Sequence, residues 1–381
     1  KQLGLPQQSL SEWRAALATN LVALLASLAP SHADSHVYFG NSGAEAIEAA
    51  LKMARAARPR ATTFINFARA YHGKTHGALA LTPNEEYQAP FRPLAPDVRT
   101  LPFGDAEAVA SALRELGDRA CAIIIEPVQG EGGVNVPPAG YLREVGEIAR
   151  RHDVLVIADE VQTGLGRTGH WFASVADGLE PDIVTLAKPL GGGILPVSAT
   201  IARKAVYKAL LPGLASKRHS TTFGGGSLAM AVGLKSLELL VTEDLATRSA
   251  EHGRYGLERL QGLAAQYPNL VESVRGAGML FAISLKPVVG FKVPGVSEED
   301  VQTLAAALLL RELPLGGVHG CYSTNASRTA RLTPPLNQPR ELLVEMFDRV
   351  ATVMAKNPTP LSMLKKLPLP RMLKLARMAL G

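Results

Sequence analysis

Short runs of apolar and often β-branched residues recur through the middle of the chain and predict buried strands. The clearest runs are Ala122–Ile125, Val154–Ala158 and Ile183–Leu186. Because they are apolar on both faces, they are typical of strands covered on both sides of a parallel sheet. Between the first two, Tyr141–His152 has the 3.6-residue spacing of an amphipathic helix. These segments together predict a βαβ unit with a right-handed crossover, and therefore an α/β domain.

From about Glu243 onward the pattern changes. A helical stretch at 246–267 leads into Gly276-Ala277-Gly278 and the strand-like Met279–Leu285, and a second helical stretch covers Glu298–Glu312. A proline-rich turn follows, so we expect a second, smaller α+β domain. The expected organisation is a short N-terminal segment at 1–35, a large cofactor-binding domain at 36–243, a small C-terminal domain at 244–356 and a basic tail at 357–381.

The charge distribution argues against nucleic acid as a partner. Of the formal net charge of +6, five positive charges lie in residues 358–381, which contain no acidic residue. The rest of the chain is thus nearly neutral, and aromatic residues make up only 5% of the whole. A nucleic-acid surface needs a basic face with stacking aromatics on the folded domain. For the basic segment Met363–Leu380 we favour a solvated tail over a membrane- or partner-binding helix.

Cysteine usage and hydropathy point to a cytoplasmic protein. Only Cys121 and Cys321 occur, far apart and without metal-ligand spacing, so neither a disulfide scaffold nor a metal site is expected. The apolar run Leu21–Leu28 is about half the length of a membrane span. It lacks the basic lead-in and the cleavage site of a signal peptide. The chain begins with Lys1, which leaves an upstream segment open.

Polar residues follow each of the three predicted strands. Glu126 comes after the first, Asp159 after the second, and Lys188 after the third, ahead of three glycines at 191–193. Ligand sites of open α/β sheets gather at the carboxyl ends of the strands, so these side chains are expected to share one crevice. The glycines would let a ligand approach the backbone. A desolvated lysine can form an imine, and an aspartate opposite it would suit a pyridinium nitrogen.

A possible anion site precedes the helical run that ends at Ala57. The segment Asn41-Ser42-Gly43-Ala44-Glu45 would place backbone N–H groups at a helix N-terminus, where a phosphate binds readily. A capping box formed by Ser42 and Glu45 explains the same residues without any ligand. The two interpretations are compatible, because the N–H groups of Gly43 and Ala44 stay available in both.

These pieces, in this order, resemble the class III (ω-amino-acid type) aminotransferases of the fold-type I pyridoxal-phosphate (PLP) enzymes. The resemblance covers about residues 36–340. The matching segments are FGNSGAEAIEAALKMAR (39–55), YHGKTHGAL (71–79), IIIEPVQGEGGVNVPPAGYL (123–142), LVIADEVQTGLGRTG (155–169), PDIVTLAKPLGGG (181–193), STTFGGGSLA (220–229) and ARLTPPL (330–336).

The resemblance implies a role for each cofactor-site residue. Lys188 is similar to the Schiff-base lysine that also carries the proton, and Asp159 to the partner of the pyridine nitrogen. The remaining expected cofactor contacts are Val161 and Tyr71 on the two ring faces, Gln162 on the ring hydroxyl, Ser42, Gly43 and Ala44 on the phosphate, Thr222 on the phosphate of the neighbouring subunit of a homodimer, and Glu126 behind Gln162.

Two further residues are implied for the substrate. Arg331 resembles the arginine that binds a substrate carboxylate, and Glu131 the glutamate that neutralises it when an amine lacks that group. Simpler roles exist for some residues. Tyr71 can belong to the core, His72 fits a structural histidine better than a base, and Arg331 can hold the small domain together. Gly166, Arg167 and Gly169 are most economically a turn, near the dimer interface in the family.

The resemblance implies a ping-pong aminotransferase that moves an amino group between an ω-amine and a 2-oxo acid, such as 2-oxoglutarate or pyruvate. Putrescine- and ornithine-type and acyl-aldehyde relatives are the nearest types. The alternatives are an aminomutase or epimerase on the same fold, and a non-catalytic scaffold, which Lys188 together with Asp159 disfavours. The chain departs from the family in its short front, in Gly226-Ser227 and in Pro189. The short front would fit the C-terminal module of a longer protein, for instance one fused to a thioester reductase.

Overall fold

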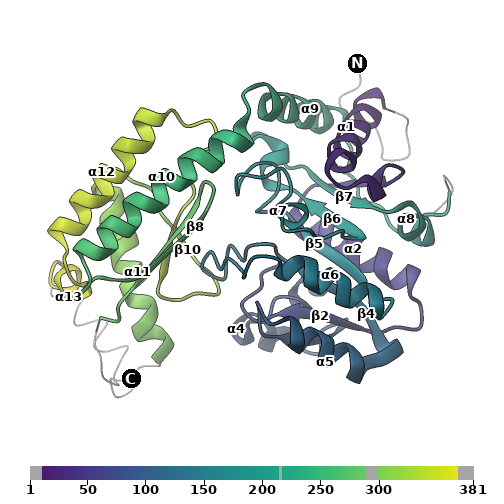
Figure 1. Ribbon diagram of the computed structural model, residues 1–381, viewed down its shortest axis with the longest axis horizontal. Helices are drawn as coiled ribbons and strands as arrows, with labels where there is room; N and C mark the ends of the chain where they lie inside the picture. The colour runs from purple at the N-terminus through teal and green to yellow at the C-terminus, as the bar shows by residue number, and fades with distance from the viewer. Residues whose placement is uncertain (1–10, 214–216, 289–297, 368–381) are drawn as a thin grey trace. The chain divides into compact units, whose positions relative to one another are not determined.

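The computed structural model describes residues 11–213, 217–288 and 298–367. The chain divides into two compact units, which Figure 1 shows with their elements labelled. The first unit takes in residues 1–128, 137–166 and 170–246, and the second takes in 129–136, 167–169 and 247–381. Two short segments from the middle of the chain therefore belong to the second unit.

A seven-stranded, mostly parallel sheet forms the centre of the first unit, as the sequence predicts. Its strand order is β1-β7-β6-β5-β4-β2-β3, and only β7 runs against its neighbours. The pairs β2–β3, β2–β4, β4–β5 and β5–β6 are all parallel. The strands are β1 (His36–Gly40), β2 (Thr63–Phe67), β3 (Asp97–Leu101), β4 (Ala120–Ile125), β5 (Leu155–Asp159), β6 (Ile183–Leu186) and β7 (Ser198–Ala202).

The three strands predicted from their apolar runs lie side by side at the middle of this sheet. Every residue of β4 and β6 is buried, as expected for strands covered on both faces. Strand β5 extends one residue further than predicted, so that Asp159 is its last residue. This places a carboxylate at the carboxyl end of a buried strand, where the sheet opens to ligands.

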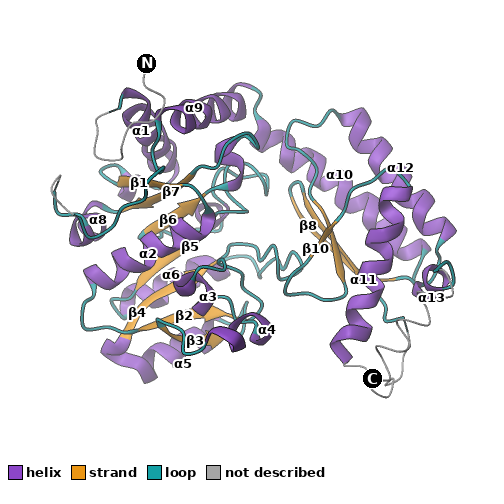
Figure 2. Cartoon of the chain, turned by 180° about the vertical axis from the view of Figure 1, so that it is seen from behind, coloured by secondary structure: helices purple, strands orange, loops and turns teal. Residues whose placement is uncertain are grey.

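Helices cover both faces of the sheet. Figures 1 and 2, which view the chain from opposite sides, show α2 on one face and α5 with α6 on the other. The buried residues of α6 include Leu142, Val145 and Ile148, the positions that the helical spacing predicts. The helices of this unit are α1 (Glu12–Leu28), α2 (Gly43–Ala57), α3 (His76–Ala80), α4 (Glu85–Gln88), α5 (Ala106–Leu116), α6 (Tyr141–Arg151), α7 (Ala173–Ala176), α8 (Lys204–Leu210) and α9 (Ser227–Thr242), with 3₁₀ turns η1 (Pro30–His32), η2 (Ala89–Phe91), η3 (Gly117–Arg119) and η4 (Lys188–Gly191).

The second unit is built on a four-stranded antiparallel sheet in the order β10-β11-β9-β8. Phe281 of β9 and Phe347 of α12 meet edge to face at 5.6 Å and are fully buried. Gly256 makes this contact possible, since a Cβ there would lie 2.5 Å from the Phe281 ring. The elements are β8 (Val271–Ala277), β9 (Leu280–Leu285), β10 (Cys321–Tyr322), β11 (Thr329–Leu332), α10 (Leu245–Gln266), α11 (Glu298–Leu315), α12 (Arg340–Lys356) and α13 (Pro360–Leu364).

The sequence supports predictions for an apolar run near the N-terminus and for a basic segment near the C-terminus. The apolar run Leu21–Leu28 forms the last turns of α1, where Leu21 and Leu25 are fully buried. Among the helices of the described residues, none combines the length and the apolar character that crossing a membrane requires. Most of the basic segment Met363–Leu380 lies outside the described residues.

Candidate active site

Three functional side chains come from the carboxyl ends of adjacent parallel strands. Glu126 directly follows β4, Asp159 ends β5, and Lys188 begins the turn η4 two residues after β6. The register pairs Ile125 with Ala158, and Asp159 with Thr185. The strand ends are therefore level, and the three residues line one cavity of about 400 Å³, as the strand pattern predicts. A volume of this size suits a small-molecule cofactor.

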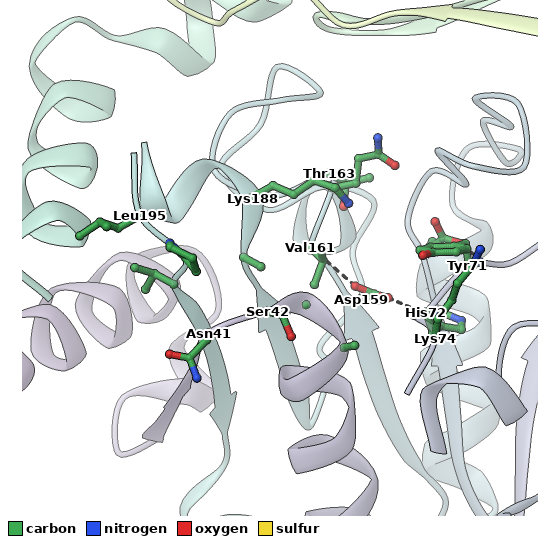
Figure 3. A pocket seen from close by; sticks show the side chains of 18 residues that line it. Asn41, Ser42, Tyr71, His72, Lys74, Asp159, Val161, Thr163, Lys188 and Leu195 are labelled. Carbon is green, nitrogen blue, oxygen red and sulfur yellow. Dashed lines mark hydrogen bonds and ion pairs between the residues drawn. The ribbon is translucent and has the colours of Figure 1, made fainter. Parts of the chain in front are cut away.

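The cavity gathers most of the predicted cofactor residues. Figure 3 shows Lys188, Asp159, Val161, Ser42 and Tyr71 around it. The cavity is also lined by four other predicted residues, Gly43, Ala44, Gln162 and Glu126. It is lined in addition by His72 and Lys74, to which the resemblance assigns no contact with the cofactor. Two lysines thus face the same space. They differ in their surroundings, because the Lys74 Nζ lies 3.9 Å from the centroid of the Tyr87 ring in a cation–π contact.

The Asp159 side chain is held in place by three hydrogen-bond partners. Its Oδ1 accepts hydrogen bonds from the Val161 N–H at 3.1 Å and the Thr185 hydroxyl at 3.2 Å. Its Oδ2 lies 2.7 Å from Nδ1 of His72, in a buried ion-pair geometry. Three hydrogen-bond partners offset the cost of burying this polar group. The Asp159 side chain is therefore fixed in place on one wall of the cavity.

His72 is the residue whose contribution the sequence reasoning missed. It fits the structural role expected of it, since its backbone N–H donates to the Thr82 hydroxyl at 3.0 Å and its side chain is buried. Its ring, however, also contacts Asp159 and lines the cavity. The sequence offers one indication that His72 lies near the site, namely its position beside Tyr71 in the segment after β2. The partner lies 87 residues away, and no local pattern indicates it.

Glu126 has an unusual protonation equilibrium. Burial raises its pKa from 4.5 to about 7, and the nearby Asp159 adds to this, while His72, the hydrogen bond from Tyr71 and Lys188 act in the opposite direction. The bond from the Tyr71 N–H to Oε2 measures 2.9 Å and fixes the start of the segment that carries His72. The contact with Gln162 that the resemblance implies stays a prediction.

The N-terminus of α2 forms the floor where a phosphate is expected. Ser42 is the N-cap, and its hydroxyl accepts from the Glu45 N–H at 3.2 Å, so this half of the predicted capping box is present. The Glu45 carboxylate accepts from the Asn41 N–H in place of the Ser42 N–H, so the second half is not formed. The backbone N–H groups of Gly43 and Ala44 have no acceptor within the described parts of the chain. Gly43 also packs against Val161, with only 2.8 Å between the Val161 Cγ1 and the place of a Cβ. Donors and dipole are thus aimed at the cavity.

Glu45 connects this floor with the segment that contains Thr222. Its Oε2 accepts from the Asn41 backbone at 3.0 Å and the Asn41 side chain at 2.9 Å, and it lies 3.3 Å from the Thr221 hydroxyl. Thr222 itself is exposed, and it is not among the described residues that line the cavity. The single chain therefore leaves Thr222 outside its own candidate site.

The surroundings of Lys188 correct two expectations. Lys188 is exposed among the described residues of the single chain. The prediction that the chain itself shields the Lys188 side chain from water is therefore wrong. The three glycines that follow do not line the cavity either, among the residues that the structure describes. Gly192 and Gly193 have φ of 59° and 73°, which explains them by backbone conformation rather than by ligand approach.

The structure also explains Pro189. It occupies the first turn of η4, where a missing N–H group costs nothing, and its carbonyl accepts from the Gly192 N–H and from the Ser236 hydroxyl at 2.7 Å. Proline therefore fixes the turn that begins with Lys188.

The two predicted substrate residues meet in the second unit. The Arg331 Nη2 and the Glu131 Oε1 are 2.5 Å apart, and both side chains are largely buried. Arg331 also donates to the Tyr322 carbonyl, whereas its Nη1 is buried and has no partner among the described residues. Glu131 accepts from the N–H and the hydroxyl of Thr324 at 3.1 and 2.8 Å. The guanidinium thus keeps donor capacity beyond its ion pair.

No group of three or more histidine, cysteine or acidic side chains in the part of the chain that the structure covers is arranged to hold a metal ion.

Comparison with known proteins identifies the family. The family model described as aminotransferase class-III matches residues 8–354. The chain belongs to the class-III aminotransferases. It is therefore an enzyme of PLP-dependent transamination, as the resemblance implies. The donors and carboxylates around the cavity fit this cofactor: free N–H groups of α2 for its phosphate, Asp159 for its ring nitrogen and Lys188 for its aldehyde.

Solved structures with the same fold include several aminotransferases. An ornithine aminotransferase from Toxoplasma gondii is 28% identical with a TM-score of 0.80, over 95% of this chain and 79% of that one. An amine transaminase from an uncultivated Pseudomonas species, in its PLP-bound form, is 28% identical with a TM-score of 0.82, over 93% and 84%. An acetylornithine aminotransferase from Elizabethkingia anophelis is 29% identical with a TM-score of 0.77, over 93% and 82%.

Proposed function

We propose that this aminotransferase moves an amino group from an ω-amine, such as a diamine, an ornithine-like substrate or an aldehyde-derived amine, to a 2-oxo acid in two half-reactions. The observation that carries the proposal is the single cavity in which Lys188 and the fixed carboxylate of Asp159 occur together. Similarity to ornithine, acetylornithine and amine transaminases supports the ω-amine class.

The roles of the residues follow from their chemistry. When bound, PLP supplies an aldehyde that takes up amino groups and a ring that withdraws electrons. Asp159, fixed in place by three hydrogen bonds, would hold a proton on the ring nitrogen. The Nζ of Lys188 takes the proton from the substrate carbon and returns it in the reverse half-reaction. Gly43 and Ala44 bind the phosphate through their N–H groups, beside the hydroxyl of Ser42.

The remaining contacts complete the proposed site. Val161 and Tyr71 cover the two ring faces, and Gln162 binds the ring hydroxyl with Glu126 behind it. We assign Arg331 to the recognition of a substrate carboxylate, with Glu131 as the counter-ion that takes over when the substrate has none. The orphan Nη1 of Arg331 supports this assignment, because a buried donor without an acceptor is costly unless a ligand supplies one.

Two exposed apolar side chains support a homodimer with shared sites. Ile194 is 75% exposed beside the cavity residue Leu195, and Phe223 is 78% exposed beside Thr222. We assign both side chains to contacts with a second subunit, which would cover their apolar surface. Thr222 would then reach the phosphate in the partner's site, which agrees with its place outside the cavity of its own chain.

A donor and acceptor panel tests the reaction. Diamines, ornithine, N-acetylornithine and 4-aminobutyrate would be assayed with 2-oxoglutarate and with pyruvate, and parallel initial-rate lines are expected. With the donor alone, product should stop at one equivalent per site. Continued turnover of the amine without an acceptor would contradict the proposal and favour an aminomutase or epimerase.

Two lysine variants test the chemistry. Lys188→Ala should lower turnover by about a thousandfold or more, within the range of general acid–base catalysis. Lys74→Ala, which loses the contact with Tyr87, should retain far more activity. The reverse ranking would overturn the role of Lys188. Mixing Lys188→Ala with Thr222→Ala subunits tests the shared site, because hybrid dimers should regain one intact site and activity above that of either variant alone.

A further inference from the structure

A second cavity lies in the C-terminal unit and has no part in the proposed reaction. It has a volume of about 360 Å³ and is lined by Glu251, His252, Arg254 and Arg340. The first three residues belong to α10, and Arg340 is the first residue of α12. Its lining therefore combines two guanidinium groups and an imidazole with one carboxylate.

The cationic side chains of this cavity have no acceptors of their own. Neither Arg254 nor Arg340 makes a hydrogen bond or an ion pair within the described residues. The Arg340 guanidinium instead stacks on the Tyr255 ring, 3.5 Å from its centroid, which fixes its orientation. Both groups thus keep all their N–H donors for a ligand.

His252 supplies the buried polar atom that most needs a partner. The residue is only 7% exposed, and its Nδ1 is buried without a hydrogen bond in the part of the chain described here. Burial lowers the pKa of His252, and Arg340 and Arg248 lower it further, so the ring is neutral near pH 7 and carries one N–H group. A buried ring nitrogen of this kind is costly unless something bonds to it.

Arg340 also begins a helix that has no side-chain cap. This helix, α12, is 17 residues long, and the N–H groups of Arg340, Glu341 and Leu342 have no acceptor among the described residues. Arg248 donates to the carbonyls of Asn337 and Gln338 at 3.2 and 3.0 Å and so holds the turn before the helix. A free helix N-terminus favours a negative charge.

The position of α10 is fixed as well. Gly253 lies so close to Gly278 that a Cβ would come within 2.4 Å of its carbonyl oxygen. The neighbours of Gly253 are His252 and Arg254, whose backbone is therefore held in place. The donors are arranged before any ligand arrives, which lowers the ordering cost of binding.

From these observations we infer that the cavity of His252, Arg254 and Arg340 binds the phosphate group of a small phosphorylated molecule, independently of the cofactor site. A phosphate oxyanion uses donors from several directions at once, and the arginine forks and the imidazole that line the cavity provide these. The cavity exceeds the size of a phosphate and leaves room for the rest of such a molecule. Two carboxylates, those of Glu251 and Glu341, lie close enough to act on His252, and they are outnumbered by the guanidinium groups of Arg248, Arg254 and Arg340.

The test is a calorimetric titration of the PLP-loaded enzyme with inorganic phosphate, while the visible absorbance shows that the cofactor stays bound. Wild type should bind one phosphate per chain beyond the cofactor. Arg340→Gln and Arg254→Gln should each weaken binding at least about tenfold, as expected for the loss of a charge-assisted hydrogen bond. The matched control is Arg259→Gln, an exposed arginine of α10 that pairs with Asp348 outside the cavity.

Transamination by Arg340→Gln without phosphate should equal that of wild type, which separates this inference from the proposed function. Equal phosphate affinity in wild type, Arg340→Gln and Arg254→Gln would overturn the inference, as would an absence of binding at millimolar phosphate. A dicarboxylate such as succinate serves as the second probe. Tighter binding of succinate than of phosphate would refute the phosphate assignment.

Discussion

Replacing His72 by phenylalanine removes one of the three donors to Asp159 while the buried volume stays nearly constant. The His72 side chain is fully buried and that of Asp159 is 5% exposed, so water cannot readily replace the lost bond. A hydrogen bond to a charged group contributes about 1.5–3 kcal/mol. We therefore expect the free energy of unfolding of the cofactor-free protein to fall by about 2 kcal/mol.

The same change should weaken cofactor binding. Without the His72 donor, the Asp159 side chain is held less firmly opposite the cofactor ring, and 1.4 kcal/mol corresponds to a factor of ten in affinity. The His72 donor also stabilises Asp159 in its contact with the bound ring, and a separate loss of about 2 kcal/mol there predicts that the dissociation constant for PLP rises roughly 10- to 100-fold. Equilibrium dialysis measures the dissociation constant, and urea unfolding with and without PLP measures the stability.

The matched variant is His72→Asn, whose amide Nδ2 can occupy the place of Nδ1 and donate to Asp159. It should recover most of the lost cofactor affinity, although it leaves a small void. If His72→Phe binds PLP and unfolds as wild type does, the His72–Asp159 contact has no energetic role and the reasoning is wrong. If asparagine and phenylalanine are equally damaging, packing rather than hydrogen bonding explains the effect.

Three further predictions concern other parts of the two units. Gly43→Ala places a Cβ 2.8 Å from Val161, so it should lower the free energy of unfolding by about 1–3 kcal/mol and weaken PLP binding. Gly262→Ala, with open space around it in α10, should be neutral or stabilising in the same urea and dialysis assays. Glu126 has a pKa raised from 4.5 to about 7, so its protonated form stabilises the fold fully below pH 4.5 and this contribution of about 3 kcal/mol disappears as the pH rises through 7. Glu126→Gln should flatten that decline in urea unfolding of the cofactor-free protein between pH 4.5 and 8, and an unchanged slope would contradict the origin in Glu126. Glu131→Gln leaves the buried Arg331 without its charged partner and should destabilise the protein by about 3–5 kcal/mol, whereas adding Arg331→Gln should recover part of the loss; additive effects in this double-mutant cycle would contradict the coupling.

The sequence predicts the centre of the large sheet well because the signal there is local. Strands β4 and β6 are continuous apolar runs, and their burial on both faces dictates that composition. Strand β7 cannot be predicted in this way, because Ser198 and Thr200 interrupt its apolar run although both are fully buried. The Thr200 hydroxyl donates to the Ala46 carbonyl, which makes its burial tolerable. Only the three-dimensional neighbourhood makes a polar residue acceptable there.

The candidate site divides in the same way. Glu126, Asp159 and Lys188 can be placed from the sequence because each follows a recognisable strand, and parallel strands end at one edge of a sheet. The contacts that tune them cannot be placed so. Asp159 depends on His72, and Arg331 depends on Glu131, 200 residues away. The prediction for the glycines after Lys188 is wrong for a related reason. The positive φ angles of Gly192 and Gly193 cannot be read from the amino-acid composition of the segment.

Asp159 and Lys188 line the same cavity but are positioned by different local structures, and the difference matches their proposed roles. Asp159 ends a strand, is buried and is bonded by three donors, which suits a group that has to keep one charge in one place. Lys188 sits on a short 3₁₀ turn that is held through the backbone of Pro189, and its side chain is exposed. The length of a lysine side chain lets its Nζ reach two atoms in turn, as carrying a proton between them requires. The desolvation that lowers a lysine pKa must then come from what covers the cavity, which are the cofactor itself and, in the proposed homodimer, the second subunit.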